Sequence, residues 1–170
     1  MEEIVNKVAK SGLITFNLEE FYDETEVVEF DMKDHLFHGL ILKEKDFRGF
    51  IKENDWQQYA GKHVALFCTA DAIVPTWAYM LVANKLSGIA GQVFFGSKTE
   101  LQQRIIHDKL NAIDVEEYRD RMVVIKGCSK FDVPIGSYVE ITNKLSPVVK
   151  SIMFGEPCST VPIYKKPRQR

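Results

Sequence analysis

Cysteine is scarce in this 170-residue sequence, and none of its three cysteines belongs to a short metal-binding or redox motif. There is no C-x-x-C and no C-x-x-H, so zinc-finger and thioredoxin-like spacings are excluded. The signatures G-x-G-x-x-G, G-x-x-x-x-G-K-S/T and G-x-S-x-G are also absent, which removes support for dinucleotide-binding, P-loop and hydrolase sites. The cysteines are therefore the first candidates for any chemistry.

The sequence also lacks long apolar runs and a strong charge of either sign. No apolar stretch approaches the roughly 20 residues that span a bilayer, and the amino-terminal MEEIVNKVAKSG has no apolar core of a secretory signal. The net charge of -2 gives no basic surface for nucleic acid. We expect a cytoplasmic protein that binds neither membranes nor nucleic acid and keeps its cysteines reduced.

The composition, 45% hydrophobic and 27% charged, is that of an ordinary globular protein. A chain of this length buries about two thirds of the surface that its unfolded form exposes, which is enough for one core. No low-complexity segment or convincing linker divides the chain. The sequence therefore predicts a single domain over residues 1–170.

What the sequence does contain is an internal repeat. A shift of 59 positions aligns residues 75–96 with 134–155, and eight of the 22 pairs are identical, including both copies of NKLS. Chance would give only about one or two identities, so this is a repeat of the kind that marks duplicated structural units. The same offset extends upstream, and the repeats are predicted over approximately 55–96 and 114–155.

Each copy has the pattern of a parallel α/β unit. The apolar runs HVALF (63–67) and RMVVIK (121–126) are typical of strands buried on both faces. After a loop and a proline, TWAYMLVANKL (76–86) and IGSYVEITNKL (135–145) carry apolar residues at helical spacing. QVFFG and KSIMFG then return as strands.

Further elements continue the alternation. EVVEFDM reads as a strand, KEKDFRGFIKEND as a helix, and SKTELQQRIIHDKL as a helix that opens with a capping box at Ser97 and Glu100. DHLFHGLIL fits either a strand or a helix. We therefore predict an α/β fold: a doubly wound, mostly parallel sheet of about five strands built from an internal duplication, with an N-terminal helical or edge extension.

The three cysteines share one local pattern. Each is followed by a hydroxyl residue and then by Val-Pro, in CTADAIVP from Cys68, CSKFDVP from Cys128 and CSTVP from Cys158. Each also follows a predicted strand, and the carboxyl ends of parallel strands share one edge of a sheet. We therefore expect the three thiols to converge there, with the closing segment TVPIYKKP folded over that edge.

Three convergent thiolates would suit a soft metal, either zinc or an iron–sulfur species. A closed tetrahedral site needs a fourth ligand, for which the candidates are Asp71, Asp132, His35 and His38. The two aspartates precede helices and also suit helix capping. The two histidines reach the site only if DHLFHGL ends at the same edge, and are otherwise ordinary polar residues.

Three functions fit these residues. The first is an accessory protein that binds a soft metal or cluster through Cys68, Cys128 and Cys158. The second is a thiol-dependent enzyme or sulfur carrier that uses Cys68 or Cys128 as a reactive thiolate near a helix N-terminus. The third is a noncatalytic interaction module whose cysteines only fill space in the core.

Four phrases resemble a known family: EIVNKVAKSGL, DAIVPTWAYMLVANKL, VVIKGCS and GEPCSTVP. Together they make the whole chain similar to a bacterial family catalogued only as a domain of unknown function. The resemblance implies no particular activity and no catalytic residues. It does imply a link with the sulfur-mobilisation machinery, which makes iron–sulfur assembly proteins the expected partners.

Overall fold

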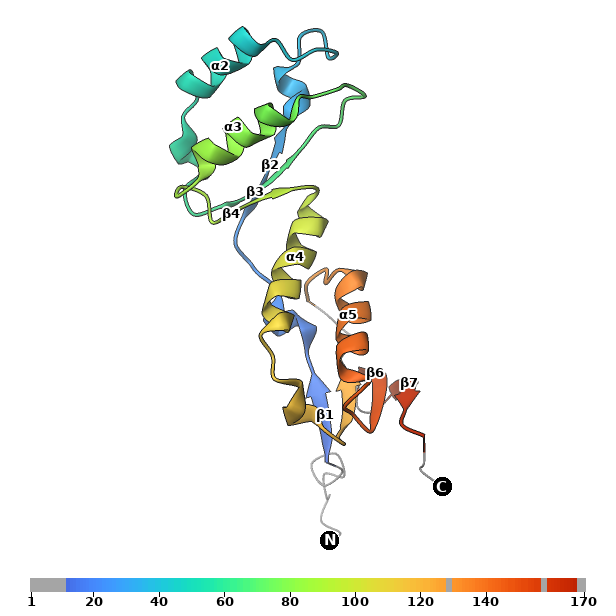
Figure 1. Ribbon diagram of the computed structural model, residues 1–170. Coiled ribbons are helices and arrows are strands. Elements are labelled where there is room, and N and C mark those ends of the chain that lie inside the picture. Colours follow the sequence, from blue (N-terminus) through green and yellow to red (C-terminus); the bar gives the residue numbers. More distant parts are fainter. Residues whose placement is uncertain (1–11, 128–129, 157–158, 168–170) are drawn as a thin grey trace. The chain divides into compact units, whose positions relative to one another are not determined.

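The computed structural model describes residues 12–127, 130–156 and 159–167 (Figure 1). The strands are β1 (Leu13–Phe16), β2 (Val27–Asp31), β3 (His63–Phe67), β4 (Gln92–Phe95), β5 (Met122–Ile125), β6 (Ser151–Glu156) and β7 (Ser159–Lys165). The α-helices are α2 (Glu44–Glu53), α3 (Thr76–Leu86), α4 (Lys98–Asn111) and α5 (Ile135–Leu145). Short 3-10 helices are η1 (Leu18–Phe21), η2 (Met32–His35), η3 (Trp56–Tyr59) and η4 (Val115–Tyr118).

The predicted α/β class is confirmed, but the strands lie in two sheets and not in one. One sheet has the order β1-β5-β6-β7, and the other has the order β2-β3-β4. All neighbours are parallel except β6 and β7. The expectation of one sheet fails because β1 and β2, although consecutive in the chain, pair with different partners.

The chain accordingly divides into two compact units. Unit 1 comprises residues 1–23 and 102–170, and unit 2 comprises residues 24–101. Unit 2 is therefore an insertion between the first strand of unit 1 and the rest of that unit. The single domain over residues 1–170 stays a prediction.

Unit 2 is a parallel sheet with two helices on one face. Phe30, Val64 and Leu66 share a buried cluster with the apolar residues of α2 and α3. Val64 and Leu66 are two positions apart on β3, so they point to the same face of the sheet. The apolar stripes of α2 and α3 therefore cover this face together (Figure 1).

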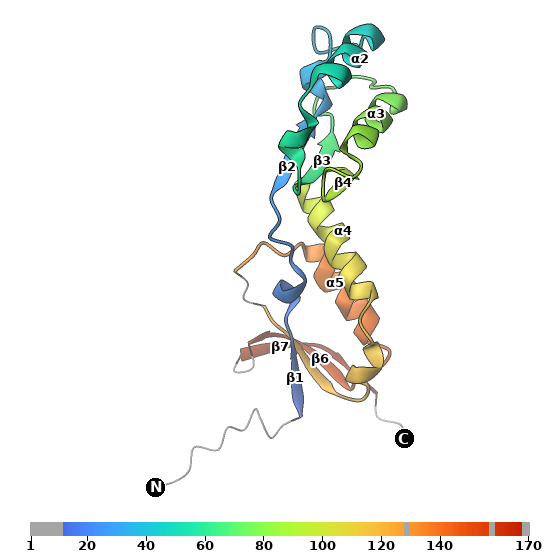
Figure 2. The ribbon, with the colours of Figure 1, turned by 90° about the vertical axis from the view of Figure 1, so that its left-hand side faces the viewer.

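Unit 1 repeats this arrangement with other elements. Phe16, Val123, Ile125 and Ile152, from its three parallel strands, share a buried cluster with residues of α4 and α5. The outer strand β7 runs antiparallel along β6, with a register shift between Ile152 and Met153 (Figure 2). The expectation that residues 160–167 fold over the carboxyl edge is therefore wrong, because this segment extends the sheet sideways.

The two repeat segments contain the same elements at the same offset. Helix α5 starts and ends 59 residues after α3, and β6 starts 59 residues after β4. The middle strands and the preceding 3-10 helices also correspond, and Gly96 and Gly155 both have positive φ, at 143° and 126°. Superposition of the segments, and their origin by duplication, stay predictions.

The start of α4 has the predicted capping box. The Glu100 N–H donates to Ser97 Oγ at 3.2 Å, and the Ser97 N–H donates to Glu100 Oε2 at 2.8 Å. The ambiguous segment 34–42 is neither a full strand nor a helix. It holds the end of η2 and a small bridge between Phe37 and Ile41.

Equivalent core truncations test whether the units unfold together. Leu86 and Leu145 are both fully buried and occupy matching positions on α3 and α5. Each Leu→Ala substitution should cost about 2–5 kcal/mol of unfolding free energy. If the chain is one cooperative domain, both variants shift the same single transition in calorimetry. Two transitions, each shifted by only one variant, would contradict the single-domain prediction.

Candidate functional site

The loop that carries Cys68 is tied to the end of the neighbouring strand. Asp31 ends β2, and Cys68 follows β3, which pairs with β2 so that Asp31 lies opposite Phe67. The Thr69 N–H donates to Asp31 Oδ1 at 3.1 Å, and the Thr69 hydroxyl donates to Asp31 Oδ2 at 2.6 Å. One carboxylate therefore fixes the first residue of the loop beyond Cys68.

Asp31 also contacts Lys33, two residues further along its own segment. It accepts the Lys33 N–H at 3.0 Å and lies 3.3 Å from the Lys33 ammonium. Burial alone would raise the pKa of Asp31, but the hydrogen bonds from Thr69 and Lys33 outweigh it and hold that pKa below its ordinary value. The carboxylate is therefore charged at neutral pH and can hold all of these donors at once.

Cys68 is a half-buried thiol at this edge. It packs against the core cluster of unit 2, and its Sγ lies 3.7 Å from the Ala70 carbonyl oxygen. Burial raises the pKa of Tyr79, and the electrostatic influence of Cys68 and of the Asp31 carboxylate acts in the same direction. Thiol, carboxylate and phenol therefore share one local environment at the carboxyl edge of the β2-β3-β4 sheet.

Unit 1 ties down the corresponding loop with a different acid. Glu19, on η1, accepts the backbone N–H groups of Lys130 and Phe131, the latter at 3.3 Å. Its other oxygen lies 3.3 Å from the Lys126 ammonium. Tyr138 matches Tyr79 in the repeat, and its pKa is raised by burial and, in addition, by the charge of Glu19. In both units, an acid at or shortly after the end of the unit's first strand thus anchors the loop that follows β3 or β5.

Cys128 and Cys158 lie outside the described residues, so their predicted convergence with Cys68 stays a prediction. The chain is described up to Gly127 and, in the later segment, up to Glu156. A Cβ atom on Gly127 would lie 3.2 Å from the Gly155 Cα atom, so the chain just before Cys128 runs beside the end of β6. Under the 59-residue offset, Cys128 corresponds to Thr69 and not to Cys68. The two cysteine positions are thus neighbours in the repeat without being equivalent.

Asp71 and Asp132 do not cap the helices that follow them. Both are exposed, and the residues that precede α3 and α5 as N-caps are Pro75 and Pro134, with no side-chain capping bond. The capping prediction is therefore wrong. A proline has no N–H to satisfy, and it starts each helix through its fixed φ.

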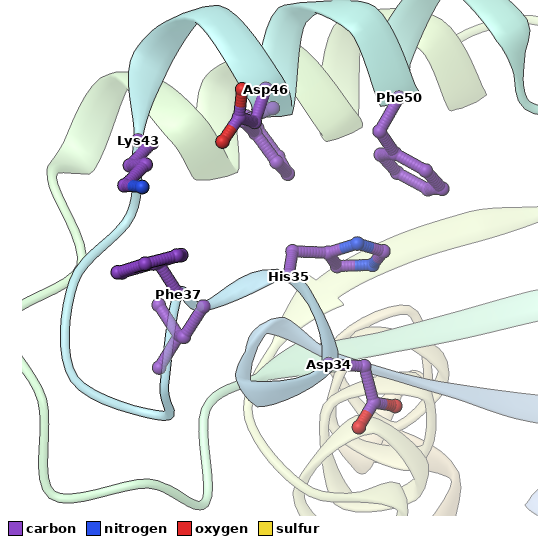
Figure 3. A pocket seen from close by; sticks show the side chains of 8 residues that line it. Asp34, His35, Phe37, Lys43, Asp46 and Phe50 are labelled. Atoms are coloured by element: carbon purple, nitrogen blue, oxygen red, sulfur yellow. The ribbon is translucent and has the colours of Figure 1, made fainter.

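His35 lines a pocket in unit 2, shown in Figure 3. The pocket has a volume of about 290 Å³ and lies between η2, the segment after it and α2. The His35 ring lies 4.0 Å from the Phe50 ring, and burial lowers the pKa of His35 despite the nearby charges of Asp34 and Asp31. His35 is therefore neutral at pH 7 and is used in aromatic packing.

His38 lies apart from this pocket lining, and its assignment as a fourth ligand, like that of His35, stays a prediction. It is exposed and has a φ of 51°, at the tip of the small bridge between Phe37 and Ile41. Across residues 12–127, 130–156 and 159–167, the structure gathers no set of three or more His, Cys, Asp or Glu side chains that could hold a metal ion. Within those same ranges, no helix is long and apolar enough to cross a membrane.

One protein-family model matches the chain over nearly its whole length. Residues 2–166 match the model described as "Protein of unknown function (DUF2480)". The chain belongs to the DUF2480 family. Comparisons of this DUF2480 chain with curated proteins and with solved structures gave no match.

Sequence reasoning missed the acids that organise the two loops. Asp31 and Glu19 contact residues 38 and 107 to 112 positions away in the chain. A usable signal was present for Asp31, which stands at the end of the strand EVVEFDM and so at a ligand-binding edge. Glu19 lies two residues after Asn17, which caps η1, and gives no comparable signal.

Removal of the Asp31 carboxylate should loosen the Cys68 loop. A hydrogen bond to a charged group contributes about 1.5–3 kcal/mol, so Asp31→Asn should accelerate alkylation of Cys68 by about tenfold or more. The rate is measured by mass spectrometry of the Cys68 peptide. Asp71→Asn, in the same loop but exposed, is the matched control and should leave the rate unchanged. Equal rates in both variants would show that Asp31 does not hold the loop.

The stabilisation that the Asp31 carboxylate gives to the Cys68 loop should be lost at low pH. The folded pKa of Asp31 is below its ordinary value of 3.8, so the charged form stabilises the fold above that value and loses this effect as the pH falls through the lowered pKa. The difference in melting temperature between wild type and Asp31→Asn should therefore be constant from neutral pH to about pH 4 and shrink below it. A difference that grows on acidification would contradict this assignment.

Proposed function

We propose that this DUF2480 protein is an accessory protein that binds a soft metal ion or an iron–sulfur species through Cys68, Cys128 and Cys158. Thiolate ligands select such metals. The observation that carries the proposal is the close approach of Gly127 to Gly155, which brings together the chain segments that lead into Cys128 and Cys158. Iron–sulfur assembly proteins are the partners that this function implies.

The strand arrangement of unit 1 supports a pair of thiolates at one edge. β5 and β6 are hydrogen-bonded parallel neighbours, with Ile125 opposite Phe154. Cys128 comes three residues after Ile125, and Cys158 comes four residues after Phe154. Two thiols that follow adjacent parallel strands at nearly the same distance are expected at the same edge of the sheet.

The contacts of Glu19 support a loop whose backbone is set before any ligand binds. Glu19 holds the N–H groups of Lys130 and Phe131 on one side of Cys128 and the Lys126 ammonium on the other. A loop fixed at both ends loses little freedom on metal binding. In this proposal Cys68 supplies the third thiolate.

Metal retention in single Cys→Ser variants tests the proposal. Freshly purified, untagged protein should contain zinc or iron by elemental analysis, and Cys158→Ser should lose it while the melting temperature changes little, since such a change rarely costs more than about 1 kcal/mol. Cys128→Ser should behave in the same way. Cys68→Ser should weaken retention if all three thiols act together.

Ser159→Ala is the matched control, because Ser159 is exposed and directly follows Cys158. It should keep the metal. Wild-type protein without metal, which also fails to take up zinc or iron after reduction, would reject the proposal. If Cys158→Ser in addition lowers the melting temperature markedly, Cys158 is a packing residue and the interaction-module function gains support.

A second candidate function, a thiol-dependent enzyme or sulfur carrier, is favoured by the surroundings of Cys68. Its thiol shares the edge with the Asp31 carboxylate and the Tyr79 phenol. The pH dependence of Cys68 alkylation separates this function from the others. A thiol that reacts well below its ordinary pKa supports nucleophilic chemistry, whereas ordinary titration supports packing.

A further inference from the structure

The outer edge of β4 in unit 2 is open, whereas the matching edge in unit 1 is covered. β4 is the last strand of the β2-β3-β4 sheet, and it has no second partner among the described strands. β6 occupies the same position in unit 1, and β7 pairs with its outer side over Ser151–Glu156. The two units therefore differ in whether a further strand pairs with the outer side of the last parallel strand.

Two equivalent phenylalanines, one in each unit, differ in exposure in the same way. Phe95 packs edge-on against Tyr79 at 5.2 Å, and Phe154 packs edge-on against Tyr138 at 5.8 Å. Phe95 is nevertheless 68% exposed, whereas Phe154, beside β7, is 38% exposed. In unit 1, Ile163 of β7 completes an apolar groove with Tyr138 and Phe154. The same aromatic pair in unit 2 lacks such a neighbour among the described residues.

The β4 edge also lacks the features that keep edge strands apart. Gln92–Phe95 contains no charged residue, no proline and no irregular pairing. β7, the outer strand of unit 1, contains Pro162 and Lys165, and its pairing with β6 has a register shift. Proteins protect exposed edges with such features, and an uncharged apolar edge without them is a template for pairing with another strand.

We propose that β4 is a self-association surface, on which β4 of a second copy of this chain pairs antiparallel across a twofold axis. Opposite residues of an antiparallel pair share a face of the sheet, so the twofold axis passes beside one residue paired with its own copy. With Phe94 opposite Phe94 of the second copy, Val93 lies opposite its Phe95. No like charges meet in this register. The resulting dimer has one continuous sheet of six strands, three from each copy.

The charges and burial of the other edges favour this choice of strand. Self-pairing of β2 about its centre would set Glu29 against Glu29, and like charges directly opposite each other destabilise a strand pair. β7 would bring Pro162 to the centre of its own pairing, where proline cannot donate a ladder hydrogen bond. β1 is uncharged, but Phe16 is buried, and β1 has no strongly exposed apolar side chain.

Helix α3 would add to the interface. A twofold axis perpendicular to a continuous sheet keeps α3 of both copies on the same face of that sheet. Met80 on α3 is 65% exposed and follows Tyr79, which contacts Phe95. Met80 and Phe95 of each copy would lose much of this exposure, and apolar burial is what makes a short strand pair stable.

Light scattering after size exclusion, over a series of protein concentrations, tests the proposal. The wild type should approach twice the chain mass of 19.5 kDa, and the amide protons of Gln92–Phe95 should exchange more slowly as the concentration rises. Phe95→Lys should weaken dimerisation by about tenfold or more, because it removes a central apolar contact. Met80→Lys should weaken it in the same direction.

Two control variants replace an exposed isoleucine outside β4 and α3 with lysine. Ile73→Lys, at a residue 92% exposed in the loop after β3, and Ile163→Lys, on β7, should both stay dimeric. Circular dichroism of all variants confirms that they are folded. A wild type that is monomeric throughout the series overturns the proposal. A dimer that survives Phe95→Lys but is lost in Ile163→Lys overturns it too, because the interface would then be β7.

Discussion

The parallel pairing of β1 with β5 determines how the rest of the chain is divided. Leu13 lies opposite Met122, so the first strand closes a loop of more than one hundred residues. The entropic cost of loop closure grows only slowly with length, and the whole of unit 2 is accommodated within that loop. Because β1 pairs with β5, β2 pairs with β3 alone. Two sheets therefore form, although the alternation of strands and helices in the sequence predicts one.

Within each unit, one acidic side chain accepts hydrogen bonds from the loop after the neighbouring strand and so fixes that loop. Asp31 is short and contacts the first loop residue beyond Cys68, whereas Glu19 is longer and reaches residues further along its loop. The two acids are not equivalent in the 59-residue repeat, yet each supplies negative charge close to the matching tyrosine, Tyr79 or Tyr138. The arrangement is therefore shared by the units although the residues that produce it are not.

Much of the local structure was predictable because it depends on neighbours in the sequence. The bounds of α3 and α5, the strand HVALF and the capping box at Ser97 follow from apolar spacing and short-range hydrogen bonds. Strand pairing was not predictable, since an apolar run shows that a strand is buried but not which strand lies beside it. The acid tethers were missed for the same reason, because their partners lie 38 or more residues away.

The divergence after Gly96 and Gly155 connects the two proposals. Both glycines have positive φ, Gly96 just after β4 and Gly155 next to the last residue of β6, and a side chain at either would meet atoms closer than 3.0 Å. After Gly96, the capping box starts α4 at once, and no further strand among the described residues pairs with β4. After Gly155, the chain passes through Cys158 and returns as β7. The segment that contains Cys158 thus leads into the strand that pairs with β6, whereas the segment at the matching place in unit 2 starts helix α4.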